Sequence, residues 1–426
     1  MVGLSNLLIH RRQIEIIEII TTVVLLVYFL DARVPPPIPP SIVNALSYPV
    51  VAVLVALHWK QIAYVATRNI PLLIFVAFAM FSLVWSADFD STLDINRGFV
   101  RTFMFGAYFT ARYSLKEQMK IIAGAIAIAA VLSWLVCVAV PSYGIGEQGW
   151  QGIFPYKNYM GRSMVLGTVL LVIMSFSSWR HWSFWVGLAL TVSLALLSQS
   201  STSILLLLIL LAQMPLYKLV KQQYRWRVIF LSLVCVLIGA VLMVVIANQE
   251  TILVDILGEG TTFNGRTPIW TLVIDTVSQE RPWFGYGYGG FWTSDAGVHV
   301  IVNSWASLEG IRDNFNAHSV YVEMFANLGL IGLILYCSVF VSVLIKDAIL
   351  LLATRKLEYF WLLQFLLFVT LASLADVGIG ISATNAYGIL SISACLSISL
   401  EYQRWQKKPD RQPVTSIATA SPLEIE

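Results

Sequence analysis

Residues 121–140 read IIAGAIAIAAVLSWLVCVAV, an apolar run that contains no charged side chain. A transmembrane helix needs about 20 such residues to cross the hydrocarbon core of a bilayer. Similar runs recur along the 426-residue chain, which is 58% hydrophobic and only 12% charged. A soluble domain carries about twice that charged fraction. The sequence therefore predicts an all-α polytopic membrane protein.

The apolar runs predict about twelve transmembrane helices. Their approximate limits are Ile14–Leu30, Ile42–Leu57, Ile70–Trp85, Gly98–Ala111, Ile121–Val140, Ser163–Ser177, Ser183–Leu197, Ser203–Val220, Val228–Ala247, His318–Leu344, Tyr359–Ala375 and Ile381–Leu400. We divide the chain into membrane helices at 1–247, a polar loop at 248–317 and further membrane helices at 318–403. The polar segment 404–426 is expected to be a disordered tail.

Basic residues predict the orientation of these helices. If the N-terminus is cytoplasmic, most of the 27 Lys and Arg residues fall in the inner segments, as the positive-inside rule requires. Both termini are then cytoplasmic, and residues 248–317 form one long periplasmic loop. The cations that stay outside are Arg33, Arg97, Arg101, Lys157, Arg162, Arg266, Arg281 and Arg312.

Several of the outer cations lie near predicted helix ends and indicate an anion site. Arg97 and Arg101 are four residues apart and share one helix face. Lys157 and Arg162 flank the start of another helix. Arginine suits phosphate groups because its guanidinium offers paired donors. Ordinary pairing with nearby carboxylates is the alternative interpretation of each of these cations.

His318 is a candidate general base at the start of a long apolar helix. It follows Asn314 and Asn316, either of which could cap that helix. The positive end of a helix disfavours the imidazolium and leaves a neutral ring that can accept a proton. The alternative is that His318 only belongs to the cap.

Aromatic side chains in the polar loop are candidates for stacking on sugar rings. Trp283 and Tyr286 stand beside the glycine-rich run that follows Pro282, and Trp270 lies earlier in the same loop. Each of them could instead belong to an aromatic belt at the membrane interface or to the packed interior. The glycine-rich run lacks the GxGxxG spacing of a dinucleotide site.

No metal site is predicted, although one motif offers an alternative. Asp88 and Asp90 form a DxD pair, which could hold a divalent cation in a metal-dependent transferase. Asp94 and Arg97 close by favour a solvated helix cap instead. The four cysteines lack a CxxC spacing, so neither a zinc site nor a disulfide framework is indicated.

Three segments together resemble the signature region of the O-antigen ligase and polysaccharide polymerase superfamily. They read GRTPIW from Gly265, ERPWFGYG from Glu280 and AHSVY from Ala317, the last followed by LGLIG at 328–332. Upstream, FPYKNYMG from Phe154 resembles the Lys-Asn segment of that family. The phrase around Arg266 and Trp270 is most similar to the exopolysaccharide polymerase branch.

The resemblance implies a GT-C type, inverting and metal-independent glycosyltransferase of the bacterial inner membrane, without a cofactor. Its substrate would be a glycan on undecaprenyl pyrophosphate. By position in the motifs, Arg266 would contact the pyrophosphate and His318 would act as the base. Lys157, Arg162, Arg97 and Arg101 would add to the pyrophosphate site.

Two departures from the family pattern bear on the assignment. Residues 198–203 read SQSSTS, where the ligases usually carry Ser-Arg, which favours a polymerase. Tyr156 replaces the family His before Lys157, and Ser319 follows His318 in place of Asn. Neither of these changes removes the proposed base.

The functions that this resemblance allows differ in the molecule that accepts the glycan. A polymerase would add repeat units to a growing glycan, with chain-length regulator and export proteins as candidate partners, whereas an O-antigen ligase would transfer the glycan to lipid A core. A polysaccharide transporter or flippase would need charged residues near the centres of its spans, and the predicted spans hold few. Nothing in the chain indicates binding to nucleic acid.

Overall fold

The computed structural model describes residues 2–33, 39–177, 182–220, 266–308, 315–374 and 376–407. These parts of the chain are almost entirely helical, which confirms the all-α prediction. Their one hairpin joins β1 (Ile145–Gly146) to β2 (Gly149–Trp150). The helices are α1 (Val2–Phe29), α2 (Pro40–Leu57), α3 (Trp59–Ala66), α4 (Ile70–Phe81), η1 (Ser82–Val84), α5 (Phe89–Arg112), α6 (Leu115–Ala139), α7 (Pro141–Gly144), α8 (Lys157–Ser175), α9 (Trp182–Leu197), α10 (Ser201–Ala212), α11 (Met214–Val220), α14 (Arg266–Glu280), α15 (Asp295–Val302), α16 (Trp305–Leu308), α17 (Val320–Thr354), α18 (Leu357–Ala372) and α19 (Ala386–Gln406).

Every predicted span inside the described ranges overlaps a helix. Five helices of the described chain are long and apolar enough to cross a membrane. A sixth span results if α3 and the α4–η1 segment count as one, although they meet at 99°. Helices α9 and α18 are apolar but shorter, and the predicted span Val228–Ala247 lies outside the described residues. The protein is a multi-pass membrane protein, and the figure of about twelve spans stays a prediction.

Helix α19 forms the centre of the bundle and packs against α5 and α17. Its residues from Ala386 to Leu400 are buried throughout. Gly106 of α5 allows the close approach, because a Cβ there would lie 2.9 Å from the carbonyl oxygen of Ile389. Small residues serve this purpose at helix interfaces in membranes. A hydroxyl contact of 2.9 Å between Thr110 and Ser393 adds a polar link across the same interface.

Helix α17 is broken at Gly329, whose φ of 65° and ψ of −167° are not helical. The segment that follows α14 fills this break, and the Leu330 N–H donates to the Pro282 carbonyl at 2.8 Å. Gly285 can enter the break only because it has no side chain: a Cβ would lie 2.6 Å from the Gly329 nitrogen. Backbone groups freed by a break inside a membrane protein need internal partners. The glycine-rich segment supplies them, which gives this sequence motif a structural reason.

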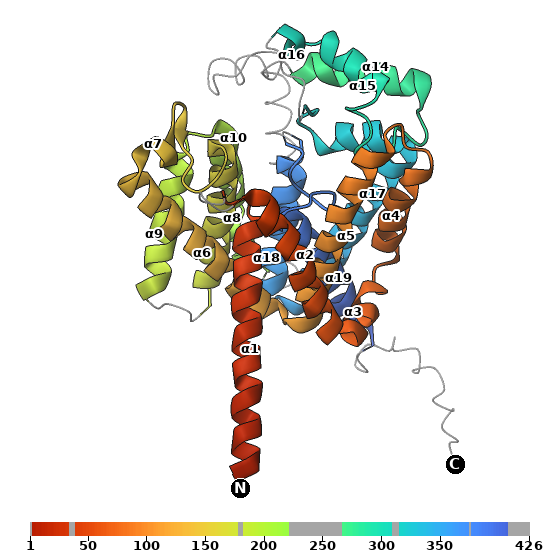
Figure 1. Cartoon of the computed structure of the whole chain (residues 1–426). Helices are drawn as coiled ribbons and strands as arrows, with labels where there is room; N and C mark the ends of the chain where they lie inside the picture. Colours follow the sequence, from red (N-terminus) through yellow and green to blue (C-terminus); the bar gives the residue numbers. More distant parts are fainter. Residues whose placement is uncertain are drawn as a thin grey trace, which may run out of the picture.

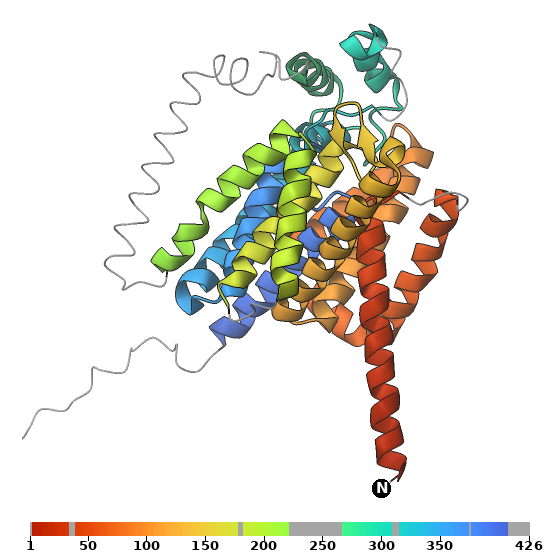
Figure 2. The same cartoon turned by 90° about the vertical axis from the view of Figure 1, so that its left-hand side faces the viewer.

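Helices α14–α16 occupy the segment that the sequence predicts as a polar loop. They lie across one end of the bundle, and α1 begins at the opposite end (Figures 1 and 2). Ile269, Val273 and Val277 recur at four-residue spacing on α14 and are fully buried. They pack with residues of α15 and of the start of α17 into a second, smaller core. This packing fixes α14 over the segment that leads into α17.

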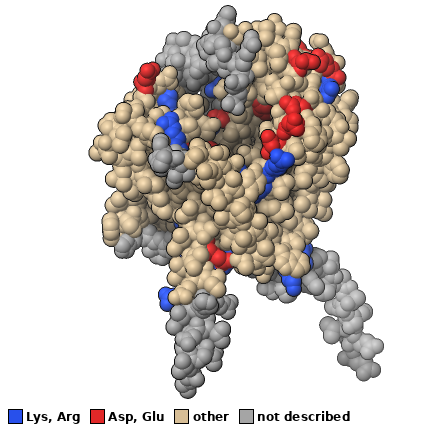
Figure 3. Space-filling view, in the orientation of Figure 1, with Lys and Arg blue, Asp and Glu red and all other residues tan. Residues whose placement is uncertain are grey.

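Charged side chains gather toward the two ends of the face shown in Figure 3, and a broad band between them is nearly free of charge. That distribution is expected of a protein whose middle lies in lipid, where a charge is costly. Near the α14 end, acidic and basic side chains surround a hollow in the surface (Figure 3).

Candidate functional site

A polar cavity of about 1090 Å³ opens between α8, α10, the β-hairpin and the segments that precede α17 and follow α18. The predicted residues Lys157, Arg162, Arg266 and His318 all line it. Asp376, which no motif indicated, lines it as well. Residues that lie far apart in the sequence therefore meet at one place, as is usual for a binding site.

Arg162 lies in the second turn of α8 with a side chain that is only 4% exposed. Its Nη1 is 2.5 Å from Oδ2 of Asp376, and its guanidinium lies over the ring of Tyr159, 4.7 Å from the centroid. Among the described residues, neither Nη1 nor Nη2 has a hydrogen-bond partner, and Nη1 is held by the ion pair alone. Buried donors without such a partner are costly. Arg162 lines the cavity, so its guanidinium is a candidate for binding an anion there.

Acidic side chains around Arg162 compensate part of its charge. Asp31, which follows α1, is partly buried, and its Oδ2 accepts a hydrogen bond of 2.9 Å from Nδ2 of Asn385. Burial is the main cause that raises the pKa of Asp31 to about 6, and the nearby Asp376 adds to the rise. The carboxylate of Asp376 thus pairs with Arg162 and lines the cavity, whereas that of Asp31 acts on Arg162 from outside the cavity lining.

Lys157 begins α8 at the mouth of the cavity. Its Nζ donates to the carbonyl of Gln148 at 3.1 Å and to the carbonyl of Gln199 at 3.3 Å. These bonds join the β-hairpin to the turn between α9 and α10. The ammonium has no carboxylate partner in the described part of the chain, so its charge is available to an anion.

Arg266 lies on α14, whose described part runs from Arg266 to Glu280, and lines the cavity. Its guanidinium offers paired donors that suit a phosphate group. Arg266 therefore adds a second arginine to the cavity that holds Arg162.

His318 lines the cavity with a partly buried ring and a positive φ of 51°. A residue other than glycine in this conformation costs about 1 kcal/mol or more, and such strain clusters at functional sites. Burial, followed by the charge of Arg266, lowers the pKa of His318, while Asp376 opposes the shift. The neutral ring that a general base needs is therefore favoured.

The prediction that Asn316 caps the helix beginning near His318 is wrong. Helix α17 has Ser319 as its N-cap residue, not Asn316. Asn316 instead accepts the His318 N–H at 2.9 Å, within the turn before the helix. The lowered pKa of His318 thus follows from burial and from Arg266, rather than from a cap.

Trp270, a predicted glycan-binding residue, holds the segment that carries His318. Its Nε1–H donates to the carbonyl of Ala317 at 2.7 Å. Tyr286, the second candidate, is 3% exposed and its hydroxyl bonds Glu280, so its ring faces protein. Trp283 is 59% exposed but does not line the cavity. Of the three, Trp283 alone presents a free aromatic surface.

Arg97 and Arg101 do not line the cavity. Arg97 is exposed and pairs with Asp94 at 2.9 Å. Arg101 is buried, and its Nη1 donates to Oδ1 of Asn44 and Oγ of Ser47, each at 2.6 Å. The structure thus separates these two arginines from Lys157 and Arg162, with which the sequence grouped them.

The DxD pair acts as a helix cap. Asp88 is the N-cap of α5, and its Oδ1 accepts the Ser91 N–H at 3.1 Å while its Oδ2 accepts the Ser91 hydroxyl at 2.8 Å. No group of three or more His, Cys, Asp or Glu side chains suited to a metal occurs in the described part of the chain. Capping of α5 thus accounts for the hydrogen bonds of both carboxylate oxygens of Asp88.

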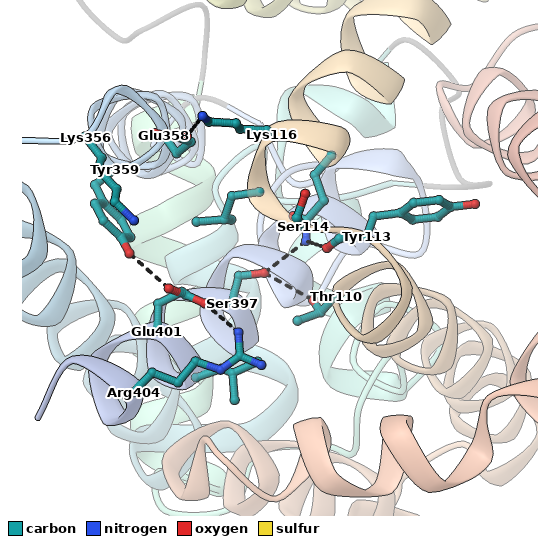
Figure 4. Close-up of a pocket in the computed structure, with 13 residues that line it drawn as sticks. Thr110, Tyr113, Ser114, Lys116, Lys356, Glu358, Tyr359, Ser397, Glu401 and Arg404 are labelled. Carbon is teal, nitrogen blue, oxygen red and sulfur yellow. Dashed lines mark hydrogen bonds and ion pairs between the residues drawn. The ribbon is translucent and has the colours of Figure 1, made fainter. Parts of the chain in front are cut away.

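A second cavity, of about 240 Å³, lies at the other end of the bundle, between the starts of α6 and α18 and the end of α19 (Figure 4). Lys116 lies 3.6 Å from Glu358, and Arg404 lies 2.7 Å from Glu401, which also accepts the Tyr359 hydroxyl at 3.2 Å. Its charged groups thus largely pair with one another. The polar cavity at the α14 end, where Lys157, Arg162, Arg266 and His318 meet, is the better candidate for a site.

Sequence reasoning missed Asp376, the carboxylate that pairs with Arg162. It lies one residue beyond the predicted end of the span Tyr359–Ala375. An acidic residue at the outer boundary of an otherwise apolar helix was the available signal. Its partner could not be known, because Arg162 lies more than two hundred residues earlier.

Comparison with known proteins agrees with the motifs. Residues 186–337 match a family model described as O-Antigen ligase, a range that includes Arg266 and His318 but neither Arg162 nor Asp376. Exopolysaccharide production protein ExoQ of Rhizobium meliloti (strain 1021) is 28% identical over 206 residues, which are 46% of this chain and 46% of the relative. The matched region thus spans about half the length of that curated relative. Together, these findings confirm the resemblance to the O-antigen ligase-related superfamily and agree with its exopolysaccharide branch.

Proposed function

We propose that this protein is a glycosyltransferase of the bacterial inner membrane that polymerises oligosaccharide repeat units carried on undecaprenyl pyrophosphate. The cavity at the α14 end would face the periplasm, and both termini would be cytoplasmic. Arg162 carries the proposal: its buried guanidinium, whose Nη2 has no hydrogen-bond partner among the described residues, lines a polar cavity together with Arg266 and His318. A membrane enzyme that acts on polysaccharide is what the comparisons support; the donor and the reaction are the proposal.

The reaction would be a single displacement at the anomeric carbon of the donor. His318 takes the proton of an acceptor hydroxyl, whose oxygen forms the new glycosidic bond. The bond from the anomeric carbon to the pyrophosphate oxygen breaks with its electron pair, and lipid pyrophosphate leaves. Attack from the face opposite the leaving group inverts the configuration, as a GT-C type enzyme without a metal would.

The leaving group gains negative charge as that bond breaks, and the cations of the cavity would stabilise it. Arg162 and Arg266 offer paired guanidinium donors, and Lys157 offers an ammonium at the mouth. Removing one donor of such a preorganised set costs about a hundredfold in rate or more. Arg97 and Arg101 lie outside the cavity, so the proposal does not include them.

Product size tests the proposal directly. Purified protein would be incubated with lipid-linked repeat units, and the glycans would be separated by length. A ladder of longer lipid-linked glycans supports a polymerase. A repeat unit that is transferred only to an added lipid A core acceptor would favour the ligase alternative, which the description of the matching family model suggests.

A further inference from the structure

The residue before His318 is held through both of its backbone polar groups. The Ala317 N–H donates to Oε1 of Glu323 at 2.7 Å, and its carbonyl accepts the Trp270 indole N–H at 2.7 Å. On the other side of His318, the Val320 N–H donates to the Ser373 carbonyl at 2.9 Å. The strained turn at His318 is thus fixed from three directions.

Glu323 is the acidic member of this arrangement and lies in the short piece of α17 before the break. Its side chain is buried, with the residue 8% exposed. Besides the Ala317 N–H, Oε1 accepts the Trp292 indole N–H at 2.8 Å, and Oε2 accepts Nδ2–H of Asn327 at 3.2 Å. No cation pairs with this carboxylate in the described part of the chain, so hydrogen bonds alone hold it. A buried carboxylate kept for packing alone would be costly.

Asn327 extends the arrangement to the glycine-rich segment. Its Oδ1 accepts the Gly289 N–H at 3.1 Å and the Phe291 N–H at 3.4 Å. Because Nδ2 is turned toward Glu323, the amide can satisfy both neighbours in one orientation only. Glu323 and Asn327 therefore connect the turn at His318 to the loop between α14 and α15.

We infer that Glu323 is a positioning residue for His318, acting with Asn327 through the backbone of Ala317. It does not line the polar cavity, so it would not touch substrate. The effect of Glu323 on the reaction rests on the proposed function of His318 as a base. Its effect on the position of the His318 ring does not depend on that function, so the two effects can be tested separately.

Two substitutions together would reverse the direction of the hydrogen bond between Glu323 and Asn327. In Glu323→Gln, Oε1 keeps its two donors, but a new NH₂ group faces the NH₂ of Asn327. In Asn327→Asp, a second carboxylate faces Glu323. In the double variant Glu323→Gln/Asn327→Asp, the new amide can donate to one oxygen of the new carboxylate. The other oxygen of that carboxylate still accepts from Gly289 and Phe291.

The first measurement is the rate at which diethyl pyrocarbonate modifies His318, followed by mass spectrometry of its peptide. The ring is partly buried, so loosening the turn should expose it. We expect each single substitution to raise the rate severalfold and the double variant to return it to the wild-type value. This readout needs no substrate and holds even if the proposed function fails.

The second measurement is kcat and KM in the polymerisation assay. We expect the single variants to lose about tenfold to a hundredfold in kcat with little change in KM, because a base displaced by about an ångström costs that much. The double variant should recover most of the loss. In a His318→Ala background, Glu323→Gln should cause no further loss.

Glu358→Gln is the matched control, since Glu358 is equally buried, at 8% exposed, and lies at the opposite end of the bundle. It should leave the modification rate of His318 unchanged. The inference is overturned if Glu323→Gln leaves that rate at the wild-type value, or if the double variant behaves like the sum of the single ones. Loss of activity together with a normal modification rate would also overturn it.

Discussion

Arg162 and Asp376 form an ion pair in the wall of the polar cavity, with Nη1 of the arginine 2.5 Å from Oδ2 of the aspartate. The arginine side chain is 4% exposed and the aspartate side chain 24% exposed. An incoming anion would therefore meet a guanidinium that an internal carboxylate already neutralises in part. The pyrophosphate of the proposed substrate would have to compete with Asp376 for Arg162.

This competition predicts opposite effects of two substitutions on anion binding. Arg162→Ala should weaken the binding of inorganic pyrophosphate by roughly tenfold to a hundredfold, the value of a hydrogen bond to a charged group. Asp376→Asn should strengthen it, because the competing charge is gone. Titration calorimetry on the detergent-solubilised protein measures both. Arg97→Ala, which removes a cation outside the cavity, is the control and should bind as wild type; an equal loss there would contradict the assignment.

The interlocked glycines predict a large effect on stability. A Cβ at Gly329 would overlap the carbonyl group of Trp283, and the φ of 65° is itself unfavourable for alanine. Gly329→Ala should cost about 2 to 6 kcal/mol in the free energy of unfolding. Gly124→Ala on α6 meets nothing within 4 Å and should stabilise the helix by about 0.5 to 1 kcal/mol. Thermal unfolding in detergent compares them, and equal midpoints would show that the break at Gly329 is absent.

The environment of His318 predicts the acid limb of the pH–activity profile. A general base must be neutral, so activity falls as pH drops through its pKa. Burial and Arg266 lower the pKa of His318, so kcat/KM should fall only below the usual value of 6.5. Arg266→Ala removes a nearby positive charge and should move the limb toward higher pH, whereas Arg266→Lys should not. A limb that stays in place in Arg266→Ala would show that another group titrates.

The cap at Asp88 predicts independence from metal ions. Asparagine caps a helix about as well as aspartate, so Asp88→Asn should keep both stability and activity. A metal site would instead lose a charged ligand and respond to divalent cations. Polymerisation measured with and without EDTA checks this, and inhibition by EDTA that added magnesium or manganese reverses would contradict it.

Apolar runs are enough to predict where helices of the described chain lie, since each predicted span inside it overlaps a helix. The limits of α2 agree with the prediction within two residues, because the helix begins and ends where the apolar run does. The break at Gly329 was not predicted, since it depends on a partner segment more than forty residues earlier. Helices α14–α16 lie where the sequence predicts a loop because the segment is polar, although Ile269, Val273 and Val277 carry a helical spacing.

The site was only partly predictable for a similar reason. Arg266 and His318 stand in motifs, and the cavity brings them together with Lys157 and Arg162. The arginines of α5 share the same chemistry, but hydrogen bonds to other side chains hold them elsewhere. The sequence predicts which cations lie on the periplasmic side, and the packing shows which of them line one cavity.

The central claim is that His318 and Arg266 work on a lipid-linked glycan in the polar cavity. The most direct measurement is the length distribution of glycans that the purified protein makes from undecaprenyl pyrophosphate-linked repeat units. The wild type should yield a ladder of longer lipid-linked glycans, while Arg266→Ala and His318→Ala should each lose about a hundredfold or more in rate. A full ladder from both variants would contradict the account.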